Sequence, residues 1–192
     1  MPKLGMQPIR RAALVKATIA EIGEAGSLDV TVSKIAKRAG VSSALAHHYF
    51  GGKQDLLVAA MRHILSVYGA AVRRALAGAK TPRARIDGIV AASFAPGQFE
   101  PAVIAAWLNF YVQAQSAPGA RRLLAVYQAR LRSNLVHALR PLAGDRAPEI
   151  AETLAAMIDG LYIRHALGAA PDGQGATARV AACLDGLLGE GA

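Results

Sequence analysis

The sequence contains a single cysteine, Cys183, which rules out an intrachain disulfide and fits a reducing compartment. The N-terminal segment MPKLGMQPIRR has no apolar stretch of the kind found in secretory signals. No apolar run approaches the roughly 20 residues that a membrane-spanning helix needs. We therefore expect a cytoplasmic protein with no membrane partner.

Catalytic signatures are also missing from the sequence. It contains no HExxH, GxSxG or SxxK motif, and the GGK at 51–53 lacks both the earlier glycine and the following Ser or Thr of a P-loop. Adjacent His47 and His48 point about 100° apart around a helix, so they cannot chelate one ion as an i, i+4 pair does. We therefore expect no enzyme, no metal site and no cofactor.

Acidic residues are scarce relative to basic ones. Asp and Glu number 13 against 22 Lys and Arg, which gives a net charge of +9. Residues 1–53 alone carry eight basic against three acidic side chains. This concentration favours a nucleic-acid-binding N-terminal region on a more neutral body. A solvated arginine-rich surface would give the same excess, so charge alone leaves both interpretations open.

Sustained alternation of β-branched residues, the mark of strands, is absent, whereas alanine and leucine are abundant. Glycine and proline divide the chain into segments with apolar residues at three- and four-residue steps. The pattern predicts an all-α protein of nine helices, at residues 8–25, 32–39, 42–49, 53–79, 83–95, 99–116, 119–140, 147–169 and 176–188.

Residues 31–50 combine a short helix, a tight Gly-Val-Ser turn and a second short helix. Thr31 and Ser42 are suited to cap the two helices, and Gly40 permits the left-handed conformation that ends the first one. The pattern predicts a helix-turn-helix whose second helix enters the major groove of DNA. Apolar side chains should hold it together, namely Ile35, Ala39, Val41, Leu45 or Ala46, and Phe50.

The polar residues of this region are the candidate DNA contacts. Hydroxyls and free amides at helix N-termini, together with lysine and arginine, hold phosphates, whereas side chains on the second helix meet base edges. We assign phosphates to Thr31, Ser42 and Lys53, base edges to Ser43, Ala44 and His47, phosphates or base methyls to His48 and Tyr49, and an N-terminal arm to Lys3, Arg10 and Arg11. Core packing is an equal alternative for Tyr49.

The run TVSKIAKRAGVSSALAHHYFGGKQDLL at 31–57 resembles the DNA-binding domain of TetR-family repressors. AAWLNFY at 105–111, RSNLV at 132–136 and IDGLYIR at 158–164 resemble the choline-responsive subgroup, which controls glycine-betaine genes. The resemblance implies a DNA-binding domain over 1–53 and a ligand-binding and dimerisation domain over 54–192. Ala44, His47 and Gly51-Gly52 depart from the family's usual residues, which leaves the operator sequence open.

The resemblance further implies a homodimer that binds a palindromic double-stranded operator and responds to a small-molecule effector such as choline. A repressor with another effector, for example a drug-like cation or a fatty compound, is the main alternative. A helical adaptor dimer that keeps the helix-turn-helix as a structural element, and an all-helical enzyme, are the remaining ones.

Choline carries a quaternary ammonium, which proteins hold by aromatic faces with a carboxylate nearby. Trp107, Phe110 and Tyr111 fall close to one face of a predicted helix, and Tyr162 lies three residues after Asp159 on another. We predict a cage from these five residues, with Glu100 as an alternative counter-charge. Aromatic residues at helical spacing more often belong to a core, and that interpretation competes with the cage.

The last two predicted helices each carry an apolar stripe. The stripes either complete the core or form a four-helix dimer interface with a second copy of the chain, and the pattern favours neither. Together with the family resemblance, we predict that helices 147–169 and 176–188 form the dimer interface. The stripe residues are Ile150, Leu154, Met157, Ile158 and Leu161, followed by Val180, Ala181, Leu184, Leu187 and Leu188.

Overall fold

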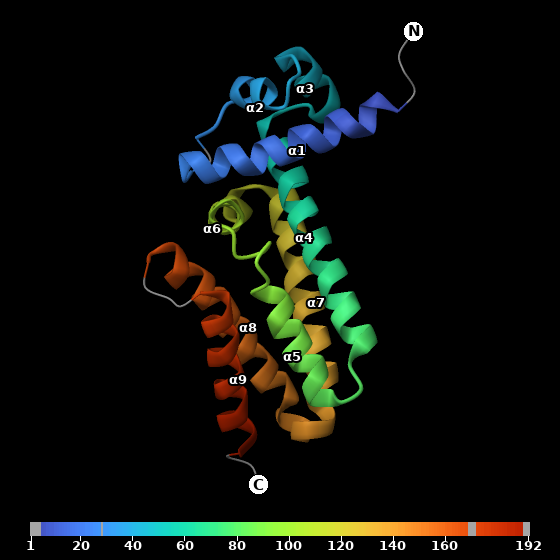
Figure 1. The fold of residues 1–192 in the computed structure, drawn as a ribbon, viewed down its shortest axis with the longest axis vertical. Helices are drawn as coiled ribbons and strands as arrows, with labels where there is room; N and C mark the ends of the chain where they lie inside the picture. The colour runs from blue at the N-terminus through green and yellow to red at the C-terminus, as the bar shows by residue number, and fades with distance from the viewer. Residues whose placement is uncertain (1–4, 28, 169–171, 190–192) are drawn as a thin grey trace. The chain divides into compact units, whose positions relative to one another are not determined.

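A computed structural model describes residues 5–27, 29–168 and 172–189. Within these ranges the chain forms nine α-helices, a short 3-10 turn at Gly144–Arg146 and no strand, so the all-α prediction is confirmed (Figure 1). The helices are α1 (Met6–Ala25), α2 (Val32–Arg38), α3 (Ser43–Phe50), α4 (Lys53–Gly78), α5 (Pro82–Ser93), α6 (Pro101–Ser116), α7 (Pro118–Ala143), α8 (Ala147–Ala166) and α9 (Gly173–Gly189).

The chain divides into two compact units. The first unit comprises residues 1–65 and 101–123, and the second unit comprises residues 66–100 and 124–192. The division falls within α4 and α7, so each of these helices contributes residues to both units. The predicted boundary at residue 53 concerns which residues bind DNA, and it stays a prediction.

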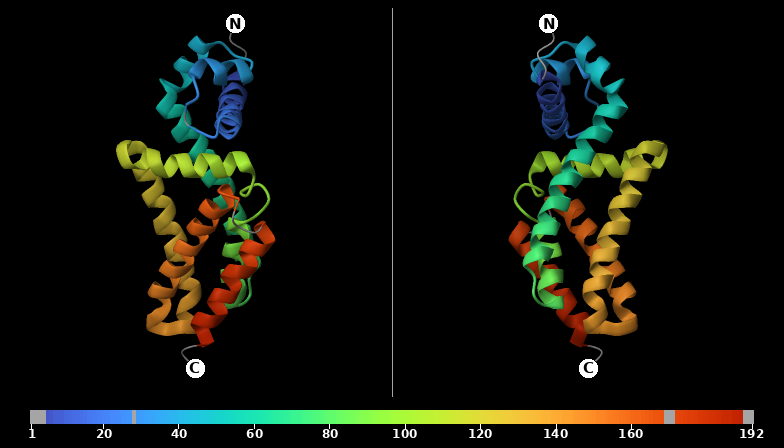
Figure 2. Two further views of the ribbon diagram at one scale, coloured as in Figure 1. Left: turned by 90° about the vertical axis from the view of Figure 1, so that its left-hand side faces the viewer. Right: turned by 90° about the vertical axis from the view of Figure 1, so that its right-hand side faces the viewer.

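In the first unit, α1 packs against both α2 and α6. Figure 2 shows α1 nearly end-on, with α2 and α3 beside it. The approach of α1 to α6 depends on Gly23, because a Cβ atom at that position would lie 2.4 Å from the Cβ of Ala102. Fully buried apolar side chains fill the space between the helices, namely Leu14, Ile22, Ile35, Ala46, Leu56 and Phe110.

In the second unit, α9 packs against α8 and α5. Most of the stripe residues predicted on the last two helices are buried here, including Ile150, Leu154, Ile158, Val180 and Leu184. Within one chain these stripes therefore complete the core, because α8 and α9 turn them toward each other and toward α5. A dimer interface on the same helices would have to use other faces.

Several predicted helix ends differ from the structure. Helix α7 continues to Ala143 with Pro141 inside it, although proline was expected to end it at residue 140. Pro141 lies in the last turn, where its missing N–H would have bonded the carbonyl of His137, an exposed residue that water can reach. Helix α9 starts at Gly173, and the carboxylate of Asp172 accepts the Gly175 N–H at 2.9 Å.

Helix α4 is long and apolar enough to cross a membrane, by length and composition alone. Charged residues interrupt its sequence, among them Asp55, Arg62 and Arg73, and the expectation of no membrane partner stays a prediction. One such helix is weak evidence for a membrane span. Its buried residues Leu56, Ile64, Tyr68 and Val72 lie in the cores of the two units, as in the core helix of a globular protein.

Candidate functional site

Helices α2 and α3 form the predicted helix-turn-helix in the first unit. The Thr31 Oγ1 accepts the Lys34 N–H at 3.2 Å, and the Ser42 Oγ accepts the Leu45 N–H at 3.2 Å, so both predicted N-caps are present. Gly40 has φ 67°, the left-handed conformation expected after α2. Ile35, Ala36 and Ala46 are buried between the helices and α1.

Both cap hydroxyls remain available to a phosphate. A hydroxyl group that accepts a backbone N–H through its oxygen still carries a hydrogen that it can donate. Thr31 and Ser42 are exposed, and Lys53 is half-exposed as the first residue of α4. The chemistry therefore suits all three assigned phosphate contacts, which stay predictions.

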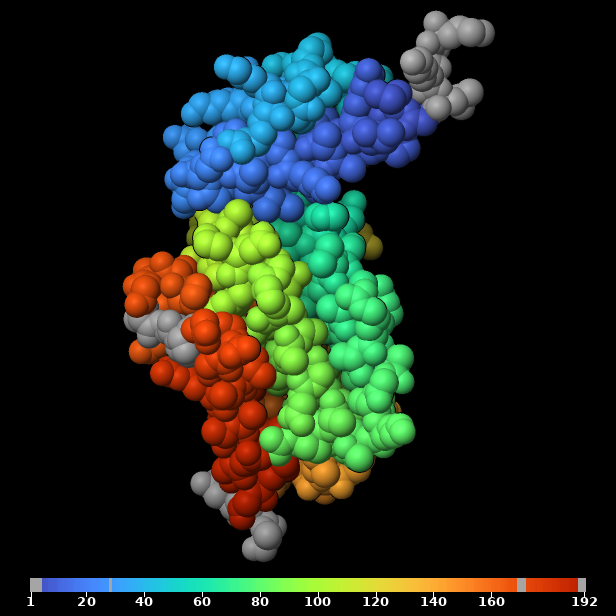
Figure 3. Space-filling model, viewed as in Figure 1, coloured from blue at the N-terminus to red at the C-terminus, as the bar shows by residue number. Residues whose placement is uncertain are grey.

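The exposed face of α3 carries Ala44, His47 and His48. In the space-filling view, α2 and α3 lie at the surface of the first unit (Figure 3). Ser43 and Tyr49, the other candidates on this helix, are half-buried, and the Tyr49 ring lies 5.6 Å from that of His48. Two of the three residues assigned to base edges are thus fully at the surface.

Arg10 and Arg11 lie within α1, as the helix predicted at residues 8–25 implies, and their assignment to DNA contacts stays a prediction. Helix α1 begins at Met6, so both arginines lie in its first two turns. The Arg11 guanidinium donates to the Tyr49 carbonyl and lies 4.3 Å from the centre of the Phe50 ring. Arg11 therefore ties α1 to the end of α3, a role that the sequence analysis missed. Lys3 lies outside the described residues.

A second link joins α2 to α1. The Arg38 guanidinium donates to the Glu21 carboxylate at 2.6 Å and also to the Glu24 carboxylate. The hydrogen bonds that Arg38 donates to Glu24, which has the larger effect, and to Glu21 raise the pKa of Arg38 above its ordinary value. With the Arg11 contacts, this link holds both helices of the helix-turn-helix on α1.

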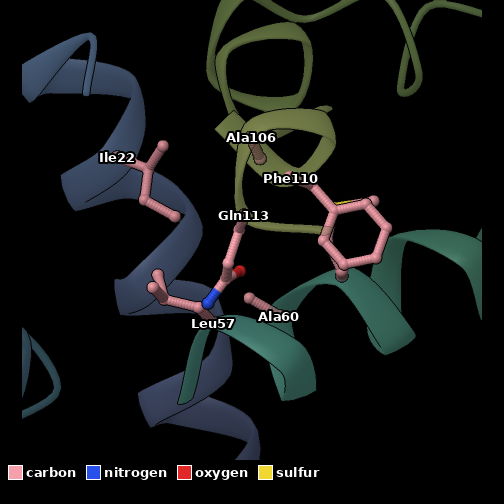
Figure 4. A pocket seen from close by; sticks show the side chains of 7 residues that line it. Ile22, Leu57, Ala60, Ala106, Phe110 and Gln113 are labelled. Atoms are coloured by element: carbon pink, nitrogen blue, oxygen red, sulfur yellow. The ribbon is translucent and has the colours of Figure 1, made fainter. Parts of the chain in front are cut away.

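Trp107, Phe110 and Tyr111 lie on α6 in the first unit. The Trp107 ring stacks on Tyr111 with centroids 5.8 Å apart and meets Phe110 edge-on at 6.3 Å. Phe110 is only 1% exposed and borders a cavity of about 10 Å³, which holds about one water molecule (Figure 4). The cavity is lined by Ile22, Leu57, Ala60, Met61, Ala106, Phe110 and Gln113. It is too small for choline, so core packing explains Phe110 here.

Tyr162 belongs to an aromatic cluster in the second unit, made of Phe94, Phe99, Tyr162 and His165. The Tyr162 ring stacks on Phe94 at 5.7 Å and meets Phe99 edge-on at 5.3 Å, and the His165 ring lies 4.3 Å from Phe99. The Tyr162 hydroxyl donates to the Ser93 carbonyl. His165 is half-buried, with its ring against Phe99.

Asp159 places a negative charge near this cluster. Burial raises the pKa of Tyr68. A hydrogen bond with Ser93 lowers this pKa in part, and the negative charge of Asp159 raises it. Burial, the neighbouring Tyr68 and Asp159 raise the pKa of Tyr162 far above its ordinary value. Tyr68 also meets Tyr127 edge-on at 5.7 Å. Aromatic faces beside a carboxylate suit an organic cation, and neither Tyr68 nor His165 was among the residues predicted for such a site.

The five residues of the predicted cage belong to different units. Trp107, Phe110 and Tyr111 are in the first unit, whereas Asp159 and Tyr162 are in the second unit, as is the exposed Glu100. Their grouping into one site stays a prediction.

The two buried phenols predict a loss of stability at alkaline pH. Tyrosines of the unfolded chain ionise near pH 10, but the raised pKa values of Tyr68 and Tyr162 keep these phenols protonated in the folded protein. Their contribution is complete below about pH 10, and above it each phenol lowers the free energy of unfolding by up to about 1.4 kcal/mol per pH unit. Urea unfolding at several pH values measures the slope.

Tyr68→Phe removes one of the two ionisable phenols. We expect its free energy of unfolding to fall less steeply above about pH 10 than that of the wild type, by about 1.4 kcal/mol per pH unit. Equal slopes in the two proteins would contradict the prediction, whatever their difference at neutral pH.

The chain matches two family models. Residues 14–60 match the bacterial regulatory proteins of the tetR family, and residues 82–189 match the C-terminal region of BetI-type transcriptional repressors. The first match contains the helix-turn-helix, and the second contains both Asp159 and the aromatic cluster.

Curated relatives resemble the chain over most of its length. The HTH-type transcriptional regulator BetI of Brucella anthropi is 56% identical over 94% of this chain and 94% of its own. The protein of the same name from Rhizobium meliloti is 52% identical over 89% of this chain and 85% of its own.

Solved structures share the fold. A putative transcriptional regulator from Pseudomonas aeruginosa is 29% identical, with a TM-score of 0.80 over 97% of this chain and 93% of its own. One from Saccharomonospora viridis, solved in complex with choline, is 22% identical with a TM-score of 0.82 over 91% of this chain and 95% of its own, and this likeness shows the fold alone. The chain therefore belongs to the tetR family of bacterial regulatory proteins and carries the C-terminal region of its BetI-type repressors.

Proposed function

We propose that the protein is a cytoplasmic, homodimeric repressor that binds a palindromic operator and responds to choline. The observation that carries the DNA-binding part is the helix-turn-helix itself, capped at Thr31 and Ser42 and held on α1 by Arg11 and Arg38. Its second helix presents Ala44, His47 and His48 to solvent, as major-groove recognition requires. In a symmetric dimer, two such helices meet the two halves of a palindrome.

The proposed dimer interface uses exposed faces of α8 and α9. Ile163 in the last turn of α8 and Leu167, the residue that follows the helix, are 45% and 76% exposed. On α9 the small residues Ala178, Ala182 and Gly186 are exposed at four-residue spacing, which allows close approach of a second helix. These faces support a four-helix contact between two copies of the chain.

Choline is the proposed effector for two reasons. The curated relatives carry the name BetI, and a structure of the same fold was solved with choline. In the second unit, Phe94, Phe99 and Tyr162 offer aromatic faces, and Asp159 offers a negative charge. Trp107 and Tyr111 stay candidates for the same cage. Choline would then lower DNA affinity to the extent that it binds the DNA-free conformation more tightly.

The test is a titration with choline, monitored by the fluorescence of Trp107, the only tryptophan, and by calorimetry. Betaine and sodium chloride are the controls, because betaine adds a carboxylate and the salt tests ionic strength alone. We expect saturable binding of choline and weaker binding, by about tenfold, to Asp159→Asn. Absence of choline binding by both methods would reject choline and favour another effector. A gel shift with the gene's own upstream DNA tests operator binding independently of the effector.

Lys53→Ala should weaken binding to all DNA sequences about equally. Removing one phosphate contact makes the dependence of log affinity on log salt shallower by about 0.9 for each lysine lost. Titrations between about 50 and 200 mM sodium chloride measure this slope. Lys80→Ala, which removes an exposed lysine of the second unit, should leave the slope unchanged. The same slope in the wild type and Lys53→Ala would remove Lys53 from the DNA interface.

A further inference from the structure

The side chain of His47 is exposed on α3, yet its orientation is fixed by the end of its own helix. The Nδ1 atom lies 2.9 Å from the Gly51 carbonyl oxygen, and the Gly51 N–H donates to the His47 carbonyl at 2.7 Å. Gly51 has φ 77°, a left-handed conformation that favours glycine. One hydrogen bond thus holds the imidazole ring on the turn after α3, and the second closes the backbone of that turn.

The first of these bonds determines which ring nitrogen carries the hydrogen. A carbonyl oxygen only accepts hydrogen bonds, so Nδ1 must be the donor. A neutral imidazole has one N–H, and its other nitrogen is then an acceptor. In the neutral form of His47, Nε2 is therefore an acceptor, located on the exposed face of the helix.

An acceptor on a recognition helix distinguishes the bases by their major-groove edges. Adenine N6 and cytosine N4 are amino donors, whereas guanine O6 and N7 and thymine O4 are acceptors that would repel Nε2. We propose that His47 selects an amino base, adenine or cytosine, at one position of each operator half-site and disfavours guanine and thymine there. This inference rests on the proposed function as a DNA-binding repressor.

The first test selects duplexes from a random pool at about pH 8.5, where imidazole side chains are neutral. We expect the wild type to prefer A or C over G or T by about fivefold at one position of each half-site. His47→Asn can still donate to the Gly51 carbonyl from its amide but has no atom equivalent to Nε2, so it should lose that preference and keep the others. His48→Asn, altered at the neighbouring exposed position, should keep it.

The second test removes the amino group from DNA. At the selected position, adenine is replaced by purine, or cytosine by 2-pyrimidinone, both of which lack the exocyclic amine. We expect wild-type affinity to fall by about fivefold and the affinity of His47→Asn to stay unchanged, because a double-mutant cycle isolates this single contact. The inference would be overturned if both proteins lost affinity equally on removal of the amino group. It would also be overturned if the wild type preferred G or T at that position, or if His47→Asn kept the preference for A or C.

Two further outcomes keep the test decisive. Nitrogen NMR of the wild type at about pH 8.5 reports which ring nitrogen of His47 carries the hydrogen, and a hydrogen on Nε2 would overturn the inference even if the variant failed to fold. If the wild type enriched no duplex at all, the proposed function would fail, and the inference would fail with it. Enrichment without a His47-dependent position would reject only the inference.

Discussion

Replacing Gly23 with valine is expected to lower the free energy of unfolding by about 3 kcal/mol. A Cβ atom at Gly23 would lie 2.4 Å from the Cβ and 2.7 Å from the Cα of Ala102. Because the second of these atoms belongs to the backbone of α6, no side-chain rotation relieves the clash, and α1 must move away from α6. Urea unfolding at neutral pH measures the loss.

The displacement should also weaken DNA binding. Helix α1 carries Arg11, Glu21 and Glu24, which hold α2 and α3 in place. Gly69→Ala in α4 is the matched control, since its nearest neighbour is the flexible end of Arg73 at 3.4 Å, and it should raise stability by up to about 1 kcal/mol. If Gly23→Val unfolded like Gly69→Ala, the close approach of α1 and α6 would be refuted.

Phe110→Ala should lower the free energy of unfolding by about 3 to 5 kcal/mol. Phe110 is 1% exposed and borders the small cavity beside Met61 and Gln113, so truncation enlarges a void that its neighbours cannot close. Chemical denaturation monitored by circular dichroism measures the change. Tryptophan fluorescence is less suitable, because the substitution also alters the surroundings of Trp107, whose ring contacts Phe110.

Val112→Ala tests whether the loss comes from burial. Val112 lies two residues further along α6 and is 65% exposed, so its truncation should change the free energy of unfolding by less than about 0.5 kcal/mol. A loss below about 1 kcal/mol for Phe110→Ala would contradict the core assignment and return Phe110 to the candidate effector residues.

The helices and the helix-turn-helix could be predicted from the sequence because their signals are local. Thr31 bonds Lys34, Ser42 bonds Leu45, and the left-handed Gly40 stands directly after α2, so each cap joins residues that are three positions apart or fewer. The predicted end of α7 at residue 140 was wrong for an equally local reason. A proline in the last turn of a helix removes only a hydrogen bond that water can replace, so α7 continues past Pro141.

The contacts that position the candidate sites could not be predicted in this way. Arg11 meets the Tyr49 carbonyl across 38 positions, and Tyr162 meets the Ser93 carbonyl across 69. Residue types and spacing do not specify which helices become neighbours. The sequence analysis therefore gives no sign that Arg11 contacts the end of α3, or that Tyr68 and His165 lie near Tyr162.

By itself, the sequence determined the all-α class, the capped helix-turn-helix and the likeness to TetR-family repressors, because periodicity, caps and motifs act over a few residues. Only the tertiary structure decided that the stripes of α8 and α9 are used within one chain, that Arg11 supports α3, and that His47 is held on Gly51. The first two outcomes depend on which surfaces pack together, and burial of apolar area sets them through residues that are distant in the chain. His47 and Gly51 are only four positions apart, but their contact depends on the orientation of the ring, which residue types and spacing do not specify.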